Sequence, residues 1–244
     1  MAFKSEFMKI FKEGLEPYGF KRMKGTDFFG KLVNEEILLF ISFKKYSPPD
    51  RGLKAFDVIS GVQTIYSPDL STSTFELPAL RMTNYCVPGI EGNIKAQYVY
   101  NESNLSIVLE EALTTTKEVI LPLLTSIKDL KSCVEFLVRF RFDLLYGADT
   151  LNRDSVLLIM TDNHDSFEAV FRQQEELAKR IANDDTSSDY YRYIKKRFFD
   201  SIQETIESRD RVWASKELQE AVHKEAARRA EINKAQLRKY GFDI

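Results

Sequence analysis

The segment from Gly25 to Lys31 has the residue spacing of a phosphate-binding loop, Gly-x-x-x-x-Gly-Lys. In such a loop the backbone N–H groups wrap a phosphate, the lysine contacts it, and a following serine or threonine holds magnesium. The residue that follows here is Leu32, which cannot coordinate magnesium, and the spacer contains Phe28 and Phe29. Adjacent aromatic residues are typical of a strand, so we expect a strand at this position and no nucleotide site.

An acidic cluster at 162–165 contains His164 and follows two further carboxylates, Asp149 and Asp154. The only other histidine, His223, is distant in sequence, and neither Glu-x-x-His nor Cys-x-x-Cys spacing occurs around these residues. Such spacings are what metal sites require. A turn whose last aspartate caps the next helix explains the cluster, so we expect no metal and no cofactor.

Two cysteines, Cys86 and Cys133, are the strongest nucleophiles that the chain offers. A catalytic cysteine needs a nearby base, and nothing in the sequence links either one to a histidine. Cys133 lies at a helical position where packing is the simpler interpretation. We therefore expect no catalytic residues, although enzyme activity stays open. The absence of a disulfide pattern favours a reduced, cytoplasmic protein.

The segment 190–199 interleaves aromatic with basic side chains, as proteins that bind single-stranded nucleic acid do. Helical spacing turns its aromatic residues toward a core and leaves a basic outer face. This candidate partner-binding face consists of Arg192, Lys195, Lys196 and Arg197. We expect it to pack against the acidic helix predicted at 165–184, with another protein or a phosphate as alternative partners. As a function, nucleic-acid binding ranks third, after a protein-binding module and an enzyme or small-ligand-binding protein.

Residues 67–94 lack clear periodicity and are rich in proline and glycine. A long irregular segment in a compact domain is either functional or conceals an element that the pattern does not reveal. It carries polar and aromatic side chains that suit a ligand cleft against the sheet. The candidate cleft residues are Tyr66, Arg81, Asn84 and Tyr85.

These candidates must be positioned by a fold that we expect to be α+β. Apolar spacing predicts an amphipathic helix over 2–16. Alternation predicts strands over 27–33, 36–45, 55–66 and 95–101, the first two joined as a hairpin at Asn34-Glu35. Both faces of the second strand are apolar at its start, which favours a central position in a small antiparallel sheet of about four strands.

From Asn104 the apolar period becomes helical and predicts a helix pair. Pro122 is expected to kink or end the first helix, and Gly147 to stop the second. We therefore expect an α+β domain over 1–147. The apolar pattern of residues 148–244 predicts further helices, so we expect an all-helical domain or extension. Its last helix should run from Ser215 to Tyr240, with Trp213 packing before it.

The chain has 244 residues and a formal net charge of −2, so no global field recruits nucleic acid or anionic lipid. Charged residues interrupt the first fifteen positions, and no apolar run spans a bilayer, so we expect neither a signal peptide nor membrane insertion. Charge is nevertheless polarised. Residues 148–189 carry ten acidic and four basic side chains, whereas 190–244 carry nine and thirteen.

Several short motifs resemble a bacterial domain family of unknown function, catalogued as number 4304. The motifs are Gly19-Phe20-Lys21, Phe28-Phe29, the strand ending Phe43-Lys44-Lys45-Tyr46-Ser47, and Phe56 to Gly61-Val62. The resemblance covers roughly residues 1–145. The chain departs from the family at Phe43-Lys44, where a glutamine is expected before the lysine. The family brings no catalytic residues, and some relatives are similar to immunity proteins of bacterial toxin systems.

The combined pattern favours a non-catalytic protein-binding module whose partner is another protein attracted by charge complementarity. The resemblance implies that this module is immunity-like. The alternative is an enzyme or small-ligand-binding protein with a cleft between the sheet and residues 67–94. The oligomeric state is left open by the sequence.

Overall fold

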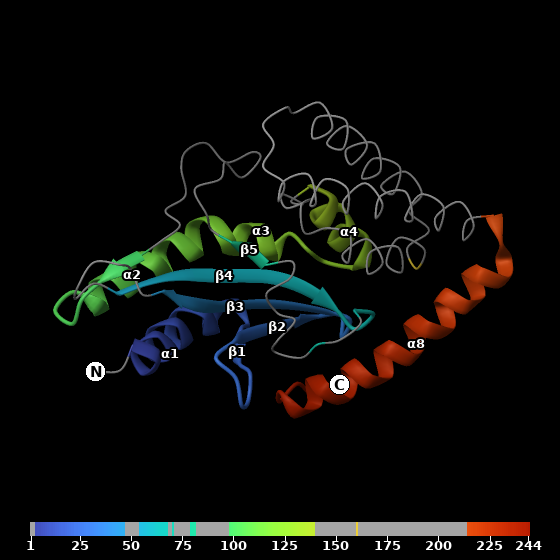
Figure 1. Ribbon diagram of the computed structural model, residues 1–244, viewed down its shortest axis with the longest axis horizontal. Helices are drawn as coiled ribbons and strands as arrows, with labels where there is room; N and C mark the ends of the chain where they lie inside the picture. The colour runs from blue at the N-terminus through green and yellow to red at the C-terminus, as the bar shows by residue number, and fades with distance from the viewer. Residues whose placement is uncertain are drawn as a thin grey trace, which may run out of the picture. The chain divides into compact units, whose positions relative to one another are not determined.

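The computed structural model describes residues 3–46, 54–67, 70, 79–81, 98–139, 160 and 214–244 (Figure 1). The chain divides into two compact units. The first comprises residues 1–65, 69–133 and 232–244, and the second comprises 66–68 and 134–231. The predicted domain boundary at 147 and most of the predicted helices beyond it lie outside the described residues.

The first unit is built around an antiparallel sheet, which confirms the α+β class. Its strands are β1 (Lys21–Arg22), β2 (Phe29–Val33), β3 (Ile37–Tyr46), β4 (Lys54–Thr64), β5 (Ala79–Arg81) and β6 (Tyr98–Tyr100). The order runs β1-β2-β3-β4, and the outer edge of β4 pairs with β6 near its start and with β5 near its middle. The prediction of about four strands missed β1 and β5, which are too short to show alternation. β5 is the element concealed in 67–94.

β3 is a central strand, as its two apolar faces predict, and Ile37 to Ile41 are all buried. The predicted hairpin is also present. Asn34 and Glu35 have φ of 50° and 59°, the left-handed values that a tight hairpin of this twist requires. Asn34 also donates through Nδ2 to the Lys128 carbonyl oxygen at 2.7 Å, so the hairpin is tied to the loop before α4 (Leu130–Arg139).

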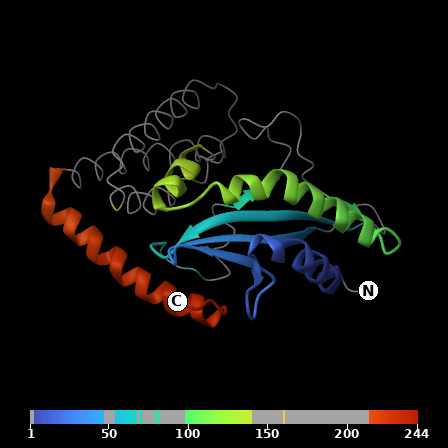
Figure 2. The same cartoon turned by 180° about the vertical axis from the view of Figure 1, so that it is seen from behind.

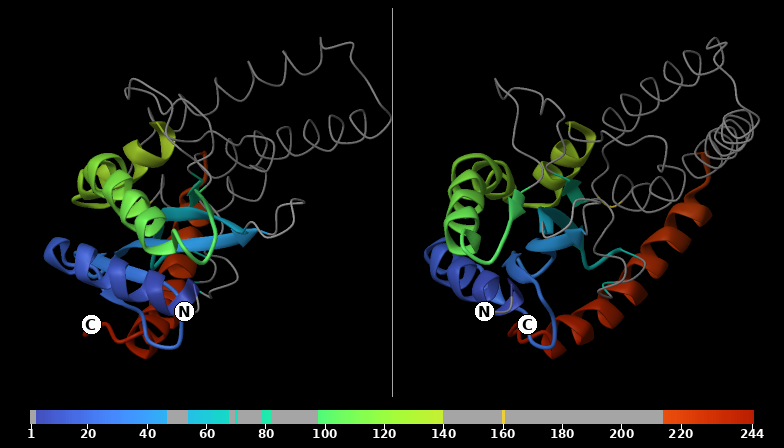
Figure 3. Two further views of the ribbon diagram at one scale, coloured as in Figure 1. Left: turned by 90° about the vertical axis from the view of Figure 1, so that its left-hand side faces the viewer. Right: turned by 60° about the vertical axis from the view of Figure 1, so that its left-hand side comes forward.

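One face of the sheet is covered by α1 (Phe3–Leu15) and by α2 (Leu105–Thr115), as the two views of Figure 3 show. The predicted N-terminal helix is thus confirmed, and a 3-10 turn, η1 (Glu16–Tyr18), follows it. Rings from the helix and the sheet form one aromatic core: Phe3, Phe7 and Phe11 from α1, and Phe29, Phe43, Phe56, Tyr98 and Tyr100 from the strands. Burying each phenyl group contributes about 2–3 kcal/mol.

α1 and α2 approach closely because Gly14 lacks a side chain. A Cβ there would collide with the branched end of Leu113. As expected, the helical segment that begins with α2 has an irregular turn just before Pro122 and ends three residues after it, at Thr125. α2 continues through a π-helical turn, η2 (Thr116–Ile120), into α3 (Leu121–Thr125). The Leu121 N–H bonds to the Thr116 carbonyl, five positions back, and this wider turn relieves the clash that a proline ring otherwise makes with the preceding turn.

The last helix, α8 (Lys216–Lys239), matches the predicted helix from Ser215 to Tyr240 (Figure 2). Its final residues and the C-terminal tail, 232–244, belong to the first unit rather than to a separate helical region. Phe242 lies where a Cβ on Gly30 would meet it at 3.0 Å. Gly30 and Phe29 alternate along β2, and Phe29 faces α1, so the tail covers the opposite face of the sheet. No periodic or turn signal in the sequence predicts that the C-terminal tail packs against the sheet.

Candidate functional site

The candidate partner-binding residues Arg192, Lys195, Lys196 and Arg197 lie outside the described part of the chain, as do Asn84, Tyr85, Cys86 and the 162–165 cluster. Two candidate cleft residues are described. Tyr66 is 9% exposed in the turn after β4, and its carbonyl oxygen accepts a hydrogen bond from Arg229 at 3.4 Å. Arg81 ends β5, where its backbone pairs opposite Ile59. The cleft itself stays a prediction.

The segment with phosphate-loop spacing is a turn and a strand, as expected. Thr26 Oγ1 donates to the Met23 carbonyl at 3.0 Å and closes the turn, while Gly30 and Lys31 pair with Phe40 and Leu39 of β3. The backbone of residues 29–31, the last part of this segment, is therefore engaged in the β2–β3 ladder.

Cys133 is a packed residue in α4, with no exposed surface. Burial raises the pKa of its thiol to about 12. The nucleophilic form of a cysteine is the thiolate, so almost none of it is present at neutral pH. Packing, the simpler interpretation of this cysteine, is therefore supported.

Neither a metal site nor a membrane-spanning helix is found in the described part of the chain. His223 lies on the exposed side of α8. Among the described residues, no group of three or more histidine, cysteine, aspartate or glutamate side chains is placed to hold a metal ion. Within the same residues, no helix combines the length and apolarity needed to cross a lipid bilayer.

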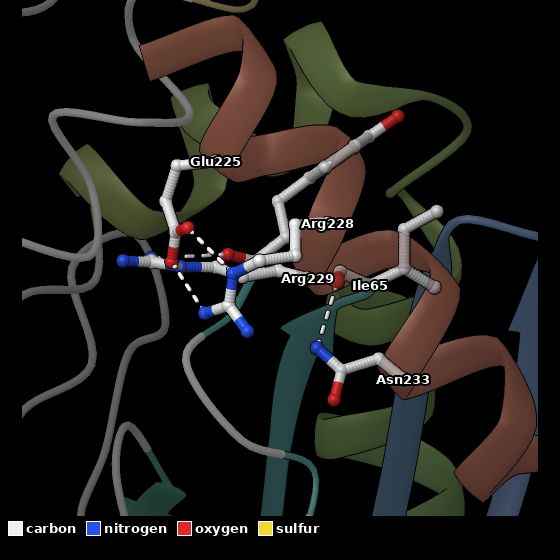
Figure 4. Close-up of polar contacts among 6 residues, drawn as sticks. Ile65, Glu225, Arg228, Arg229 and Asn233 are labelled. Atoms are coloured by element: carbon white, nitrogen blue, oxygen red, sulfur yellow. Dashed lines mark hydrogen bonds and ion pairs between the residues drawn. The ribbon is translucent and has the colours of Figure 1, made fainter. Parts of the chain in front are cut away.

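Hydrogen bonds between residues far apart in sequence join α8 to the segment that follows β4 (Figure 4). Asn233 Nδ2 donates to the Ile65 carbonyl oxygen at 2.7 Å, and Asn233 is only 1% exposed. Seven positions further along, the Tyr240 hydroxyl donates to the Leu70 carbonyl oxygen at 3.0 Å. Both acceptors are backbone carbonyl oxygens that lie beyond the end of β4 and so have no partner in the sheet. A buried carbonyl without a hydrogen-bond donor costs free energy, and these two bonds avoid that cost.

An ion-pair cluster precedes Asn233 on α8, also in Figure 4. Glu225 accepts hydrogen bonds from both Arg228, at 2.7 and 2.8 Å, and Arg229 Nε, at 2.8 Å. Hydrogen bonds from Arg228 and then Arg229 lower the pKa of Glu225 to about 2. Arg228 is 62% exposed and Arg229 only 18%, so Arg228 presents its charge to solvent while Arg229 turns toward the Tyr66 carbonyl.

A second buried polar contact joins β3 to β4. The Tyr46 hydroxyl donates to Asp57 Oδ2 at 2.6 Å, and Asp57 is only 7% exposed. Lys44 is the direct cross-strand neighbour of Asp57. Sequence reasoning missed this pair, although an aspartate inside the apolar run Phe56–Val62 was a usable signal, since buried carboxylates need a donor.

The C-terminal tail is held by β1 and by the turn that follows it. The Lys24 N–H bonds to the Tyr240 carbonyl at 3.0 Å, and Lys21 Nζ donates to the Gly241 carbonyl at 2.6 Å. Lys21 also lies 4.5 Å from the centre of the Phe242 ring, a cation–π distance. Residues 240–242 are thus held against residues 21–24.

Comparison with known proteins finds no matching family model, no matching curated protein and no matching solved structure. The described residues present the exposed side of α8 to solvent, and their buried polar contacts join parts of the fold to one another. Three groups with shifted pKa values have structural roles: Cys133 packs in α4, Asp129 caps that helix through Ser132, and Glu225 pairs with two arginines.

Proposed function

We propose that the protein is a non-catalytic protein-binding module that acts in the cytoplasm and recognises another protein, such as a toxin that it neutralises, by charge complementarity. The observation that carries the proposal is the polarised charge after residue 148, where an acidic segment precedes a basic one. Complementary charge accelerates association and selects partners. The described end of this region is mildly basic, since α8 presents five exposed basic side chains and three exposed acidic ones to solvent.

Three further expectations belong to this proposal. Residues 148–244 are helical along most of their length, as α8 supports for the final part. The N-terminal region is related to the bacterial family catalogued as number 4304, some members of which resemble immunity proteins. The thiols are reduced, which the buried, unpaired Cys133 supports for one of the two.

The test is affinity capture with the tagged chain from its native lysate, comparing wild type with the triple reversal Lys195→Glu, Lys196→Glu, Arg197→Glu. We expect a stoichiometric protein with wild type and its loss with the variant. The control reverses three exposed lysines of the first unit, Lys9, Lys12 and Lys128. It changes net charge equally and should retain the partner.

A partner held equally by wild type and by the 195–197 variant would refute the role of that face. Loss with both variants would show that net charge alone governs the capture. Either result would remove the structural basis of the proposal.

A small-ligand site is the second candidate function. It is favoured by the buried carboxylate of Asp57, which lies on β4, the strand whose edge also pairs with β5. A metabolite screen by thermal shift should then give a ligand whose stabilisation disappears with Asp57→Asn. A ligand that stabilises both proteins equally would exclude Asp57 from the site.

A further inference from the structure

α8 carries a second stripe of side chains besides the one that it buries. The buried stripe includes Ala226, Ala230, Asn233 and Leu237. The second stripe, here called the α8 seam, consists of Leu218, Ala221, Glu225, Arg228, Ile232, Ala235 and Lys239. Its members recur at alternating steps of three and four, the heptad spacing by which one helix packs along another. At about 100° per residue, the seam lies about two fifths of a turn from the buried stripe.

The seam is exposed although it holds large apolar side chains. Ile232 is 53% exposed and Leu218 is 39% exposed, and these two are among the few exposed large hydrophobic residues of the described chain. They lie fourteen positions apart, two heptads, with the Glu225–Arg228 ion pair midway between them. Apolar ends around a charged centre give a surface that is complementary to itself when reversed.

We propose that the α8 seam binds the α8 seam of a second copy of this chain, with the two helices antiparallel. When one helix is reversed about the centre of the ion pair, Glu225 lies opposite Arg228 of the other copy, and Arg228 lies opposite its Glu225. The same alignment places Ala221 opposite Ile232, and Leu218 opposite Ala235. Small residues therefore face large ones in each apolar layer, which is how packed layers fill space.

The charges beside the seam select this alignment. Glu217, Lys224, Glu231 and Arg238 precede seam positions, are all exposed, and alternate in sign. In an antiparallel pair these flanking positions face their equivalents in reverse order. Glu217 then faces Arg238, and Lys224 faces Glu231, so all four contacts of the symmetric dimer join opposite charges. A parallel pair would instead place Glu225 against Glu225 and Arg228 against Arg228.

The paired ions also set the register. Glu225 and Arg228 are already bonded within each helix, and in the dimer they form a four-membered network at the centre. A charged layer inside a seam costs stability but penalises other alignments, because a shift by one heptad would place Glu225 opposite an alanine of the seam instead of opposite Arg228. Self-association through α8 does not depend on the proposed function.

The first test is sedimentation velocity of the full-length protein over a concentration series, because dimer formation follows mass action. We expect a monomer–dimer equilibrium for wild type. Lys224→Glu places like charges opposite each other twice per dimer and should weaken the dimer about tenfold or more. Adding Glu231→Lys restores opposite charges and should restore the dimer. Glu220→Lys, which changes an exposed charge off the seam, should leave dimerisation unchanged.

The second test fixes the alignment. Ala221→Cys with Ile232→Cys, in a Cys86→Ser background, should give a disulfide-linked dimer under mild oxidation, while either single cysteine should not. The two positions lie about 16 Å apart along one helix, beyond disulfide reach within a chain. A wild-type protein that stays monomeric at every concentration overturns the proposal. So does a dimer that Lys224→Glu leaves intact, or one that the single cysteines cross-link equally well.

Discussion

Asn233 of α8 donates a hydrogen bond of 2.7 Å to the carbonyl oxygen of Ile65, although 168 positions separate the two residues. Asn233 is the polar member of an otherwise apolar stripe, and it is 1% exposed. A shift of α8 by one residue would leave the amide without this acceptor in a buried site. The bond therefore fixes the position of α8 along its own axis relative to Ile65. A buried asparagine fixes the register of a coiled coil in the same way.

Asn233→Ala should destabilise the protein by about 1–3 kcal/mol, because the Ile65 carbonyl would lose a buried donor. Urea denaturation followed by circular dichroism measures the change. Glu220→Ala, an exposed change on the same helix away from the α8 seam, should stay within about 0.5 kcal/mol of wild type. Equal stability of all three proteins would contradict a role for the bond.

Glu35→Gly should stabilise the protein by about 0.5–1 kcal/mol, because a left-handed backbone is strained for a residue with a Cβ and relaxed for glycine. Glu35 has φ of 59°. The opposite change at a second left-handed position provides the control. Gly25 has φ of 76°, and no atom lies within 4 Å of where its Cβ would stand, so Gly25→Ala should destabilise through the backbone alone. Thermal unfolding should show the two opposite signs.

Phe242→Ala should release the C-terminal tail and cost about 2–4 kcal/mol, because the ring is buried against Gly30 and beneath Lys21. Hydrogen exchange of the tail amides should accelerate selectively. Asp243→Ala, an exposed neighbour, should leave exchange unchanged. Gly30→Ala should reproduce part of the loss, since its Cβ would meet Met23 Sδ at 2.8 Å and Phe242 at 3.0 Å. Fast tail exchange already present in wild type would disprove the docking.

Cys133 should resist alkylation in the folded protein. With a pKa of about 12, its thiol is only about one part in ten thousand ionised at pH 8, and the side chain has no exposed surface. A Cys86→Ser variant isolates it. Mass spectrometry after iodoacetamide should show modification only when urea is added, and rapid labelling without urea would contradict the buried position.

Acid should weaken the protein partly through Glu225. Its pKa falls from 4.5 to about 2 on folding, so its contribution is fully present above about pH 4.5 and is lost as pH falls toward 2. Glu225→Gln should therefore lower stability at pH 6 and flatten the decline between pH 4.5 and 2. Arg228→Gln should give part of the same flattening, because hydrogen bonds from Arg228 are the largest cause of the lowered pKa. Urea midpoints across this range measure both, and parallel acid limbs would refute the linkage.

Local elements with a repeated signal could be predicted from the order of residues alone. The apolar period of residues 3–15, the alternation of 37–43 with both faces apolar, and the Asn34-Glu35 turn each predicted what the structure contains. Phe28 and Phe29 argued for a strand over a phosphate loop at Gly25–Lys31, and β2 confirms it. These signals are local because helices and strands are selected within a few neighbouring residues.

Contacts between distant segments depended on the three-dimensional packing. β1 and β5 are two and three residues long, too short for a period to be visible, and exist because a neighbouring strand offers hydrogen-bonding groups. Pro122 predicts a break in its helix, but the π-helical turn that precedes it has no periodic signal in the sequence. Asn233 meets Ile65, and Phe242 meets Gly30, because folding brings together residues whose separation in sequence carries no local signature. Burial then decides their energy, since a hydrogen bond or a missing Cβ matters most where water is excluded.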